Sequence, residues 1–257
     1  MRDSQYIGRM DRDEIGVSFL AKTVMERLAA RDAGGECQLA QSILTVLTEA
    51  MTNPNPAAFD ALKPLLKKAR VTATDLADHY FPEIARRLGC DWAEDRKSFA
   101  DVSIGVARMQ SVLRDVGADW ASEDSERPRI GTVLLILPEG EQHSFGAMVL
   151  AGQLRRRGVS VRLLLGPSPA DLRDLLAERG FDGAMLSIGC IAKLEPCRKL
   201  VKALRDGTGG ALRVLVGGAV LAENVDARAV TGADFATNDL TEALLALGLA
   251  GKGAQVG

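Results

Sequence analysis

The sequence has few histidines and cysteines, almost no net charge, and no long hydrophobic segment. Its 257 residues include two histidines and four cysteines, and the acidic and basic residues nearly balance at a formal net charge of −2. Because nucleic-acid-binding domains usually have a strongly basic surface, this balance gives no strong signal for direct nucleic-acid binding. No apolar stretch approaches the roughly 20 residues of a membrane-spanning helix, and the N-terminus lacks a signal-peptide core. We therefore expect a soluble, cytoplasmic protein.

The cysteines give no indication of a metal site or of a disulfide framework. They are Cys37, Cys90, Cys190 and Cys197, and no two of them form a Cys-x-x-Cys pair. Zinc sites and disulfide-rich domains depend on closer or more regular spacing. We expect all four to be reduced, buried thiols.

Two sequence patterns divide the chain. Apolar residues first recur at intervals of three and four, which predicts a helical bundle over residues 36–117, preceded by a helical extension over residues 1–35. Residues 118–129 are polar, acidic and without periodicity, which is typical of a linker. Short apolar strands then alternate with helices over residues 130–247, and residues 248–257 are expected to be a flexible tail.

The helices of the first region are predicted from their apolar stripes and from the residues that end them. The Asn-Pro-Asn-Pro segment at 53–56 ends the helix over residues 39–51, and Pro82 is expected to kink a helix over residues 74–88. The last helix has the clearest stripe, which predicts that its core side chains are Phe99, Val102, Val106, Met109, Leu113 and Val116.

The second region predicts an α/β fold, a doubly wound parallel sheet with the flavodoxin-like strand order. Its first strand, residues 130–137, is a continuous apolar run of the kind that is buried on both faces. Right-handed crossovers place helices on both faces of such a sheet, and this strand order puts the loop after the first strand beside the loop after the third. The other predicted strands are residues 159–165, 183–187, 212–216 and 234–236.

A histidine follows the first strand in the most informative segment of the chain, Glu141-Gln142-His143-Ser144-Phe145-Gly146. Open α/β sheets bind ligands at the carboxyl ends of their strands, where a neutral imidazole can coordinate a metal through one nitrogen. The other nitrogen then needs an acceptor, which the Glu141 carboxylate can supply. Gly146 leaves room for a bulky ligand to approach the backbone.

Small residues follow the third and fourth strands. They are Ser187-Ile188-Gly189 and Gly217-Gly218. Because neighbouring strand ends normally fill with side chains, small residues at both positions predict a slot that runs into the sheet. Ser187 has no second histidine with which to form a catalytic triad, so we do not expect an enzyme.

In this order and spacing, the residues resemble the cobalamin-binding domain of corrinoid proteins, whose motifs are Asp-x-His-x-x-Gly, Ser-x-Leu or Ser-x-Thr, and Gly-Gly. The resemblance implies that His143 binds cobalt from below in base-off adenosyl-, methyl- or hydroxocobalamin, with Glu141 as its hydrogen-bond partner. It also implies that Ser187 and Gly217-Gly218 line the pocket for the nucleotide tail. Glu141 departs from the motif in being one methylene longer than aspartate. Gly189 stands where leucine or threonine is more common, and we expect it to widen the slot.

The first region extends this resemblance. Light-sensing transcription factors of the family have a tryptophan, nine residues and then Glu-His; here Trp92 is followed by nine residues and then Val102-Ser103. The resemblance implies that the bundle covers the upper face of the corrin and that Ser103 leaves the upper cobalt position to water, hydroxide or an alkyl group. Trp92 and Val102 are equally well explained as core residues of the bundle.

The segment over residues 139–162, with Glu-Gln-His-Ser-Phe-Gly-Ala-Met at its centre, is similar to the AerR/PpaA anti-repressors of photosynthetic proteobacteria. That resemblance covers about residues 70–245. It implies a light- or cofactor-responsive regulator that acts by binding a DNA-binding repressor of photosynthesis genes. Two alternatives stay open: a corrinoid carrier subunit for methyl transfer, and a haem-binding sensor with His143 on iron.

Overall fold

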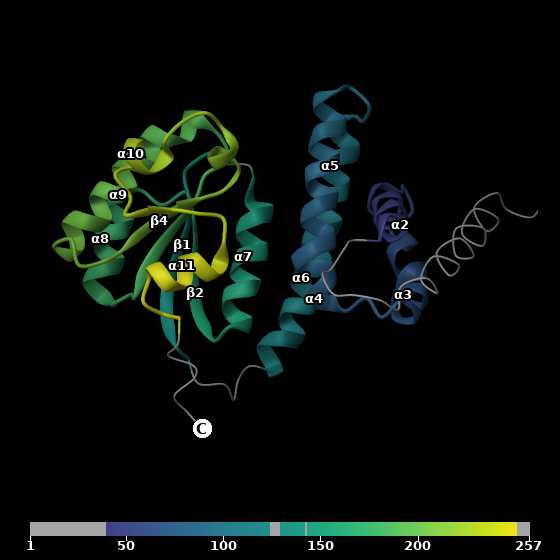
Figure 1. Ribbon diagram of the computed structural model, residues 1–257, viewed down its shortest axis with the longest axis horizontal. Coiled ribbons are helices and arrows are strands. Elements are labelled where there is room, and N and C mark those ends of the chain that lie inside the picture. Colours follow the sequence, from purple (N-terminus) through teal and green to yellow (C-terminus); the bar gives the residue numbers. More distant parts are fainter. Residues whose placement is uncertain (1–39, 124–128, 142, 251–257) are drawn as a thin grey trace, which may run out of the picture. The chain divides into compact units, whose positions relative to one another are not determined.

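The computed structural model describes residues 40–123, 129–141 and 143–250, with the backbone alone over 118–123 (Figure 1). The predicted extension over residues 1–35 and Cys37 lie outside these ranges. The chain divides into two compact units, with the boundary between Ser111 and Val112 inside helix α6. None of the described helices has both the length and the apolar character needed to cross a membrane.

The first unit is helical, as predicted. Helix α2 (Gln41–Thr52) buries Ile43, Leu47 and Met51 along one stripe and ends at the Asn-Pro-Asn-Pro segment. Helix α3 (Ala58–Lys68) buries Leu62 and Leu66. The apolar periodicity read from the sequence therefore identifies the faces of both helices that pack into the core.

The helix around Pro82 differs from the predicted one. It begins with the three-residue helix α4 (Ala73–Asp75), continues as the π-helix η1 (Leu76–Tyr80), and becomes helix α5 (Phe81–Ala93). Proline has no N–H to donate to the preceding turn. The backbone changes from π-helical to α-helical hydrogen bonding just before Pro82, at the position where the sequence predicts a kink.

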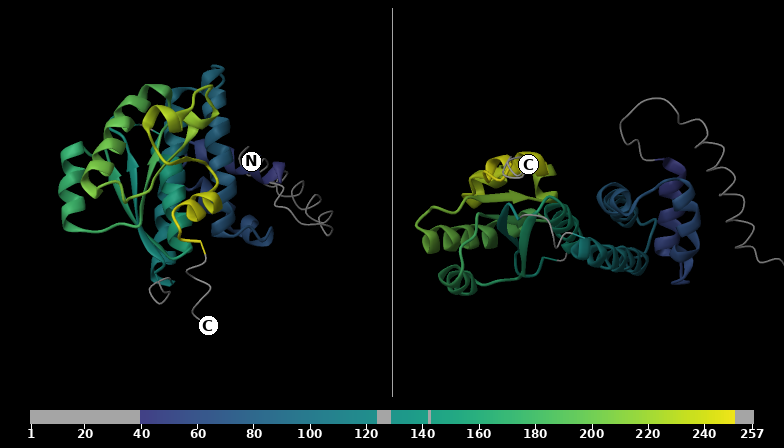
Figure 2. Two further views of the ribbon diagram at one scale, coloured as in Figure 1. Left: turned by 60° about the vertical axis from the view of Figure 1, so that its left-hand side comes forward. Right: turned by 90° about the horizontal axis from the view of Figure 1, so that it is seen from below.

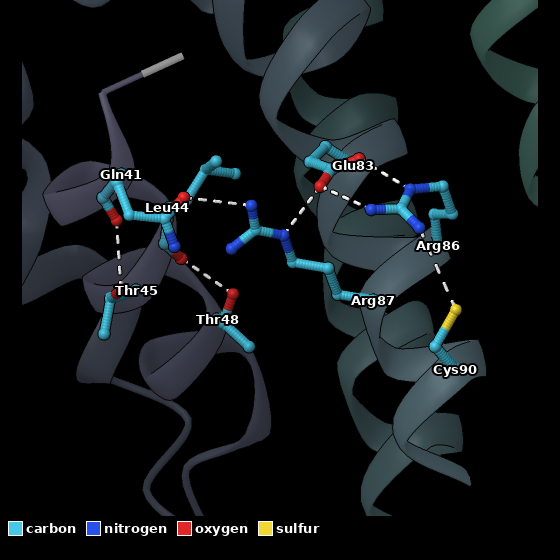
Figure 3. Close-up of polar contacts among 8 residues, drawn as sticks. All are labelled: Gln41, Leu44, Thr45, Thr48, Glu83, Arg86, Arg87 and Cys90. Atoms are coloured by element: carbon cyan, nitrogen blue, oxygen red, sulfur yellow. Dashed lines mark hydrogen bonds and ion pairs between the residues drawn. The ribbon is translucent and has the colours of Figure 1, made fainter. Parts of the chain in front are cut away.

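An ion-pair network joins α5 to α2 (Figure 3). The Glu83 carboxylate accepts hydrogen bonds from Arg86, at 2.8 and 2.9 Å, and from Arg87 Nε at 2.6 Å. Arg87 also donates to Gln41 Oε1 of α2 at 3.0 Å. The hydrogen bond from Arg86 is the main reason that the pKa of Glu83 falls to about 2. A polar groove of about 490 Å³ lies here, lined by Thr45, Thr48, Glu49, Arg86, Arg87, Cys90, Asp91 and Arg96.

Helix α6 (Phe99–Glu123) is longer than predicted and buries a narrower stripe. It runs into the segment predicted as a linker, because no proline or glycine interrupts residues 118–123. Met109 and Leu113 are buried, whereas Phe99 is 67% exposed. The prediction that Phe99 is a core residue is therefore wrong.

The second unit is a five-stranded parallel sheet with the order β2-β1-β3-β4-β5, which confirms the flavodoxin-like prediction. Strand β1 lies between β2 and β3 and is buried on both faces, and no residue from Val133 to Leu137 is more than 2% exposed. The strands are β1 (Gly131–Leu137), β2 (Val159–Leu165), β3 (Gly183–Ser187), β4 (Val214–Gly217) and β5 (Phe235–Ala236).

Helices cover both faces of this sheet (Figures 1 and 2). Val133 and Leu135 of β1 face α7 (Ser144–Arg156) and α11 (Leu240–Ala246), whereas Leu134 and Ile136 face the opposite layer. That layer consists of α8 (Pro169–Glu178), α9 (Leu194–Thr208) and α10 (Ala227–Thr231). The five residues of α10 are too few to show a helical period, so the sequence pattern does not predict this helix.

The chain remains ordered beyond the predicted start of the flexible tail. Leu249 is 1% exposed and packs against Gly131, at which an added Cβ would lie 2.6 Å from the Leu249 side chain. Gly248 takes a left-handed conformation with φ of 70°, which reverses the chain after α11. The prediction of a flexible tail is therefore wrong for residues 248–250, and residues 251–257 lie outside the described part.

Candidate functional site

His143 lies on the loop between β1 and α7, at the carboxyl end of β1. A turn closed by the hydrogen bond from Glu141 N to Pro138 O, at 3.1 Å, brings the chain back over the strand end. Gly140 takes the left-handed conformation within this turn, with φ of 67°. His143 then stands immediately before the first residue of α7, where its side chain is 73% exposed.

The Glu141 carboxylate holds the histidine ring. Its Oε1 accepts the His143 backbone N–H at 2.9 Å and lies 2.8 Å from the ring nitrogen Nδ1. The extra methylene of glutamate therefore still permits the direct carboxylate–imidazole contact that the resemblance implies. The Glu141 side chain is only 2% exposed, so a buried acceptor orients an exposed ring.

Glu141 is ionised despite its burial. Desolvation by itself raises the pKa of the carboxyl group, but hydrogen bonds from the backbone N–H groups of His143 and Gly189 and from the imidazole bring the pKa below its ordinary value. A carboxylate that can only accept requires a proton on Nδ1. Within the described part of the chain, the ring contacts Glu141 through Nδ1, which leaves the Nε2 lone pair available to a metal.

The loop after β3 completes this arrangement. Gly189 N–H donates to Glu141 Oε2 at 2.7 Å, so the third strand contributes to the histidine site. Ser187, the last residue of β3, is half-buried and lies in register with Gly217 of β4. The structure thus brings the predicted residues of the first, third and fourth strands together at one edge of the sheet.

Gly189 does not widen a slot. An added Cβ would lie 2.6 Å from His143 Nδ1 and 2.7 and 2.8 Å from the two Glu141 carboxylate oxygens. The space left by the glycine is filled by the site's own atoms, and that prediction is wrong.

The two glycines after β4 also serve close packing. An added Cβ at Gly217 would lie 2.7 Å from Thr237 O, and one at Gly218 would lie 2.5 Å from Ile188 O. Gly218 has φ of 105°, which other residues rarely adopt. Backbone atoms from the neighbouring strand ends therefore occupy the positions that side chains at 217 and 218 would need, as expected for native packing density.

Sequence reasoning missed two side chains that fix the strand ends. Asn238 accepts Gly218 N–H at 2.7 Å and donates to Gly218 O at 3.2 Å. Lys193, from η3 (Ile191–Lys193), donates to Glu139 O at 2.9 Å in the loop after β1. The polar Thr-Asn-Asp sequence at 237–239, directly after the short strand β5, was the available signal for the first of them.

The cysteines only partly follow the prediction. Cys197 is buried, and burial together with the negative charge of Glu141 raises the pKa of its thiol to about 12. Cys190 is half-buried and Cys90 is exposed. The prediction of a buried thiol is therefore confirmed for Cys197 and wrong for Cys90.

The remaining predicted residues of the loop lie at the start of α7. Gly146 is exposed, and an added Cβ there would meet no atom within 4 Å, so the backbone is open to a ligand as predicted. Phe145 is buried and Ser144 is half-buried. Gln142 lies outside the described residues.

The three predicted residues of the first unit are accessible to different degrees. Trp92 of α5 is 52% exposed and forms an edge-to-face pair with Phe99, their ring centroids 6.2 Å apart. This exposure excludes a fully buried core position for Trp92. Val102 is half-buried and Ser103 is exposed.

His143 supplies one nitrogen donor, which suits a metal whose other positions are occupied by a macrocycle. The buried carboxylate on Nδ1 is the outer-shell partner that metal-binding histidines usually have. Within the described ranges, no group of three or more histidine, cysteine, aspartate or glutamate side chains could hold a metal ion.

Known proteins share this domain and fold. Residues 131–246 match the family described as the B12 binding domain. A Rhodobacter capsulatus protein, described as an uncharacterized 20.5 kDa protein in the bchF-crtJ intergenic region, is 42% identical over 183 residues, 71% of this chain and 95% of that protein. The solved structure of the Methanosarcina barkeri monomethylamine corrinoid protein is similar at a TM-score of 0.65, with 18% identity, over 82% of this chain and 100% of that chain. At this identity the structural likeness shows a shared fold.

Proposed function

The chain belongs to the family of the Rhodobacter capsulatus protein and has a B12-binding domain, and from this we propose that it is a cobalamin-dependent regulator with His143 as the lower ligand of cobalt. One observation supports the ligand assignment above all. Nδ1 of the ring lies 2.8 Å from a buried carboxylate, while the side chain is 73% exposed. The ring is thus held in the tautomer that presents Nε2 to a metal.

The other residues of the site have distinct proposed roles. Glu141 keeps the proton on Nδ1, and Gly146 lets the corrin approach the start of α7. Ser187, Gly217 and Gly218 are the proposed contacts of the nucleotide tail.

Adenosyl- or methylcobalamin, if bound, would supply a cobalt–carbon bond that light or an attacking nucleophile can break. A regulator needs the two resulting cofactor forms to favour different protein conformations, because equal affinity shifts no equilibrium. Trp92, Val102 and Ser103 remain the proposed contacts of the cofactor's upper side. The exposed Trp92–Phe99 pair supplies apolar surface that a change of conformation could cover or expose.

The proposed partner is a DNA-binding repressor of photosynthesis genes. The relative's position between bchF and crtJ, in a photosynthesis gene cluster, supports this assignment. The near-zero net charge of the chain also favours a protein partner over direct DNA contact. In this role the protein is not itself an enzyme.

A corrinoid carrier for methyl transfer is the second candidate, since it would use the same histidine and the same fold. A carrier must expose the upper face of its cofactor to a methyl acceptor, whereas a sensor needs a change of conformation. The match to the B12 binding domain favours cobalamin over haem for either role.

The ligand assignment is tested by titrating the protein with hydroxocobalamin and recording the visible spectrum. We expect the wild type to give a histidine-coordinated spectrum that His143→Ala does not produce. We also expect His143→Ala to bind cobalamin about 10-fold or more weakly than the wild type. At free cobalamin of 100 times Kd, the wild type gains about 2.7 kcal/mol in unfolding free energy. His79→Ala is the matched control, because it removes the other histidine from an exposed position in η1. An unchanged spectrum in His143→Ala contradicts the assignment.

A further inference from the structure

We propose that Gly189 is a positioning residue for His143 and that it acts through Glu141. The absence of a side chain at position 189 and the length of the Glu141 side chain depend on each other. The inference rests on the proposed function of His143 as a cobalt ligand. Gly189 contributes a backbone N–H to the carboxylate and leaves the space in which that carboxylate lies.

The Glu141 carboxylate is fixed at both oxygens by two different loops. Oε1 is bound by the backbone N–H and the ring of His143, at 2.9 and 2.8 Å. Oε2 is bound by Gly189 N–H at 2.7 Å, from the loop after β3. Because the side chain is 2% exposed, water cannot replace a lost donor without opening the site.

Position 189 requires glycine because there is no room for a side chain, and not because of an unusual backbone conformation. Gly189 is not among the residues with positive φ. An added Cβ would instead lie 2.6 to 2.8 Å from three atoms, His143 Nδ1 and both oxygens of Glu141. These atoms are held by the hydrogen bonds just described, so any side chain at 189 must displace the carboxylate or the ring.

The length of the acid determines which residue position 189 can hold. An aspartate is shorter by one carbon–carbon bond, about 1.5 Å, and would place its carboxylate closer to its own main chain. It would therefore move away from Gly189 N–H and free space for a methyl group at 189. Each single change damages the site, while the two changes together restore the space that each residue needs.

The histidine tautomer is the direct readout of this role, and it can be measured without cofactor. Nitrogen-15 NMR of the imidazole groups reports which ring nitrogen carries the proton, and His79→Gln assigns the two histidines of the chain. At alkaline pH, where an imidazole carries a single ring proton, we expect that proton on Nδ1 of His143 in the wild type. Gly189→Ala is expected to shift the population toward the Nε2–H form and to weaken hydroxocobalamin binding by about 10- to 100-fold.

Three further variants complete the experiment. Gly180→Ala is the matched control, because an added Cβ there meets no atom within 4 Å; it should match the wild type. Glu141→Asp creates no clash but moves the carboxylate away from Gly189 N–H. It therefore tests the loss of that hydrogen bond even if Gly189→Ala does not fold. The double variant Glu141→Asp/Gly189→Ala should bind at least about 10-fold more tightly than Gly189→Ala.

The outcomes separate the two proposals. If Gly189→Ala keeps the Nδ1–H tautomer and binds cobalamin within twofold of the wild type, or if the double variant is no better than Gly189→Ala, the positioning role of Gly189 is overturned. If the tautomer shifts as expected but His143→Ala binds cobalamin unchanged, Gly189 positions His143 while the cobalt-ligand assignment fails.

Discussion

At the scale of single residues, side chains that bond to the ends of neighbouring strands hold the site together. Asn238 forms two hydrogen bonds with the backbone of Gly218, at 2.7 and 3.2 Å. They join the end of β4 to the segment after β5, and they stabilise Gly218 at a φ of 105°. Lys193 ties the loop after β1 to the loop after β3 in the same way. Cross-strand contacts of this kind keep strand-end loops in one conformation.

Asn238→Ala removes both hydrogen bonds and should destabilise the protein by about 1–2 kcal/mol, since each bond contributes about 0.5–1.5 kcal/mol. Urea unfolding measures the change as a lower midpoint with an unchanged slope. Asn238→Asp keeps the acceptor for Gly218 N–H but replaces the donor with a carboxylate oxygen opposite Gly218 O, so it should also lower the urea midpoint. Equal stability of Asn238→Ala and the wild type would contradict the structural role of Asn238.

The sequence predicted the contact between Glu141 and His143 because the two residues lie on one short loop. It did not predict the meeting of Glu141 with Gly189, which are 48 positions apart and come together only when β1 and β3 pair. For the same reason, the small residues after β3 and β4 were interpreted as an open slot. Their space is filled by chain segments whose positions depend on the folded sheet.

At the scale of elements, the packing of α2 against α5 depends partly on charge. Glu83 pairs with two arginines of its own helix, and one of these reaches Gln41 of α2 (Figure 3). Its pKa falls to about 2 in the folded protein from an ordinary value of 4.5. The folded state therefore binds fewer protons than the unfolded chain between these values, and stability rises with pH across this range.

Glu83→Gln should lower stability at pH 7 by up to about 1 kcal/mol, because the pairs are partly exposed. The contribution of Glu83 is complete above pH 4.5 and is lost as the pH falls toward 2, so the wild type and the variant should converge over that range. Unfolding in urea at several pH values, followed by circular dichroism, measures the difference. Glu195→Gln on α9 removes a single exposed pair with Arg198 and should change stability less. A constant difference from pH 7 to pH 2 would contradict the assignment.

The sequence predicts a helix boundary well where neighbouring residues form the capping hydrogen bonds. Ser168 and Asp171 form a capping box at the start of α8, in a Ser-Pro-Ala-Asp sequence that is typical of a helix N-terminus. The π-helix before Pro82 and the extension of α6 to Glu123 were missed, because hydrogen-bond register and helix propagation leave little trace in the pattern of apolar residues.

At the scale of the whole molecule, the strand order was predictable because right-handed crossovers leave few ways to arrange alternating strands and helices. The resulting sheet places the loops after β1, β3 and β4 at one edge, and it would do so equally for a sensor or a carrier. The proposed cobalamin site therefore lies at the same edge of the sheet in either role, and the fold does not distinguish the two roles. The biological role depends on whether the protein changes conformation when the upper ligand of cobalt is lost.

A sensor and a carrier should differ in their response to light. For the sensor, we expect limited proteolysis and size-exclusion elution of the adenosylcobalamin complex to change on illumination, because the two cofactor forms favour different conformations. Coupling of 1–3 kcal/mol, typical of allosteric proteins, corresponds to roughly a 5- to 150-fold difference in affinity between the two forms. His143→Ala, illuminated in the same way, should show no such change, which separates a protein response from photochemistry of free cofactor. A carrier would show the same digestion pattern before and after light, and it would release the methyl group of bound methylcobalamin to an external thiol as fast as free methylcobalamin does.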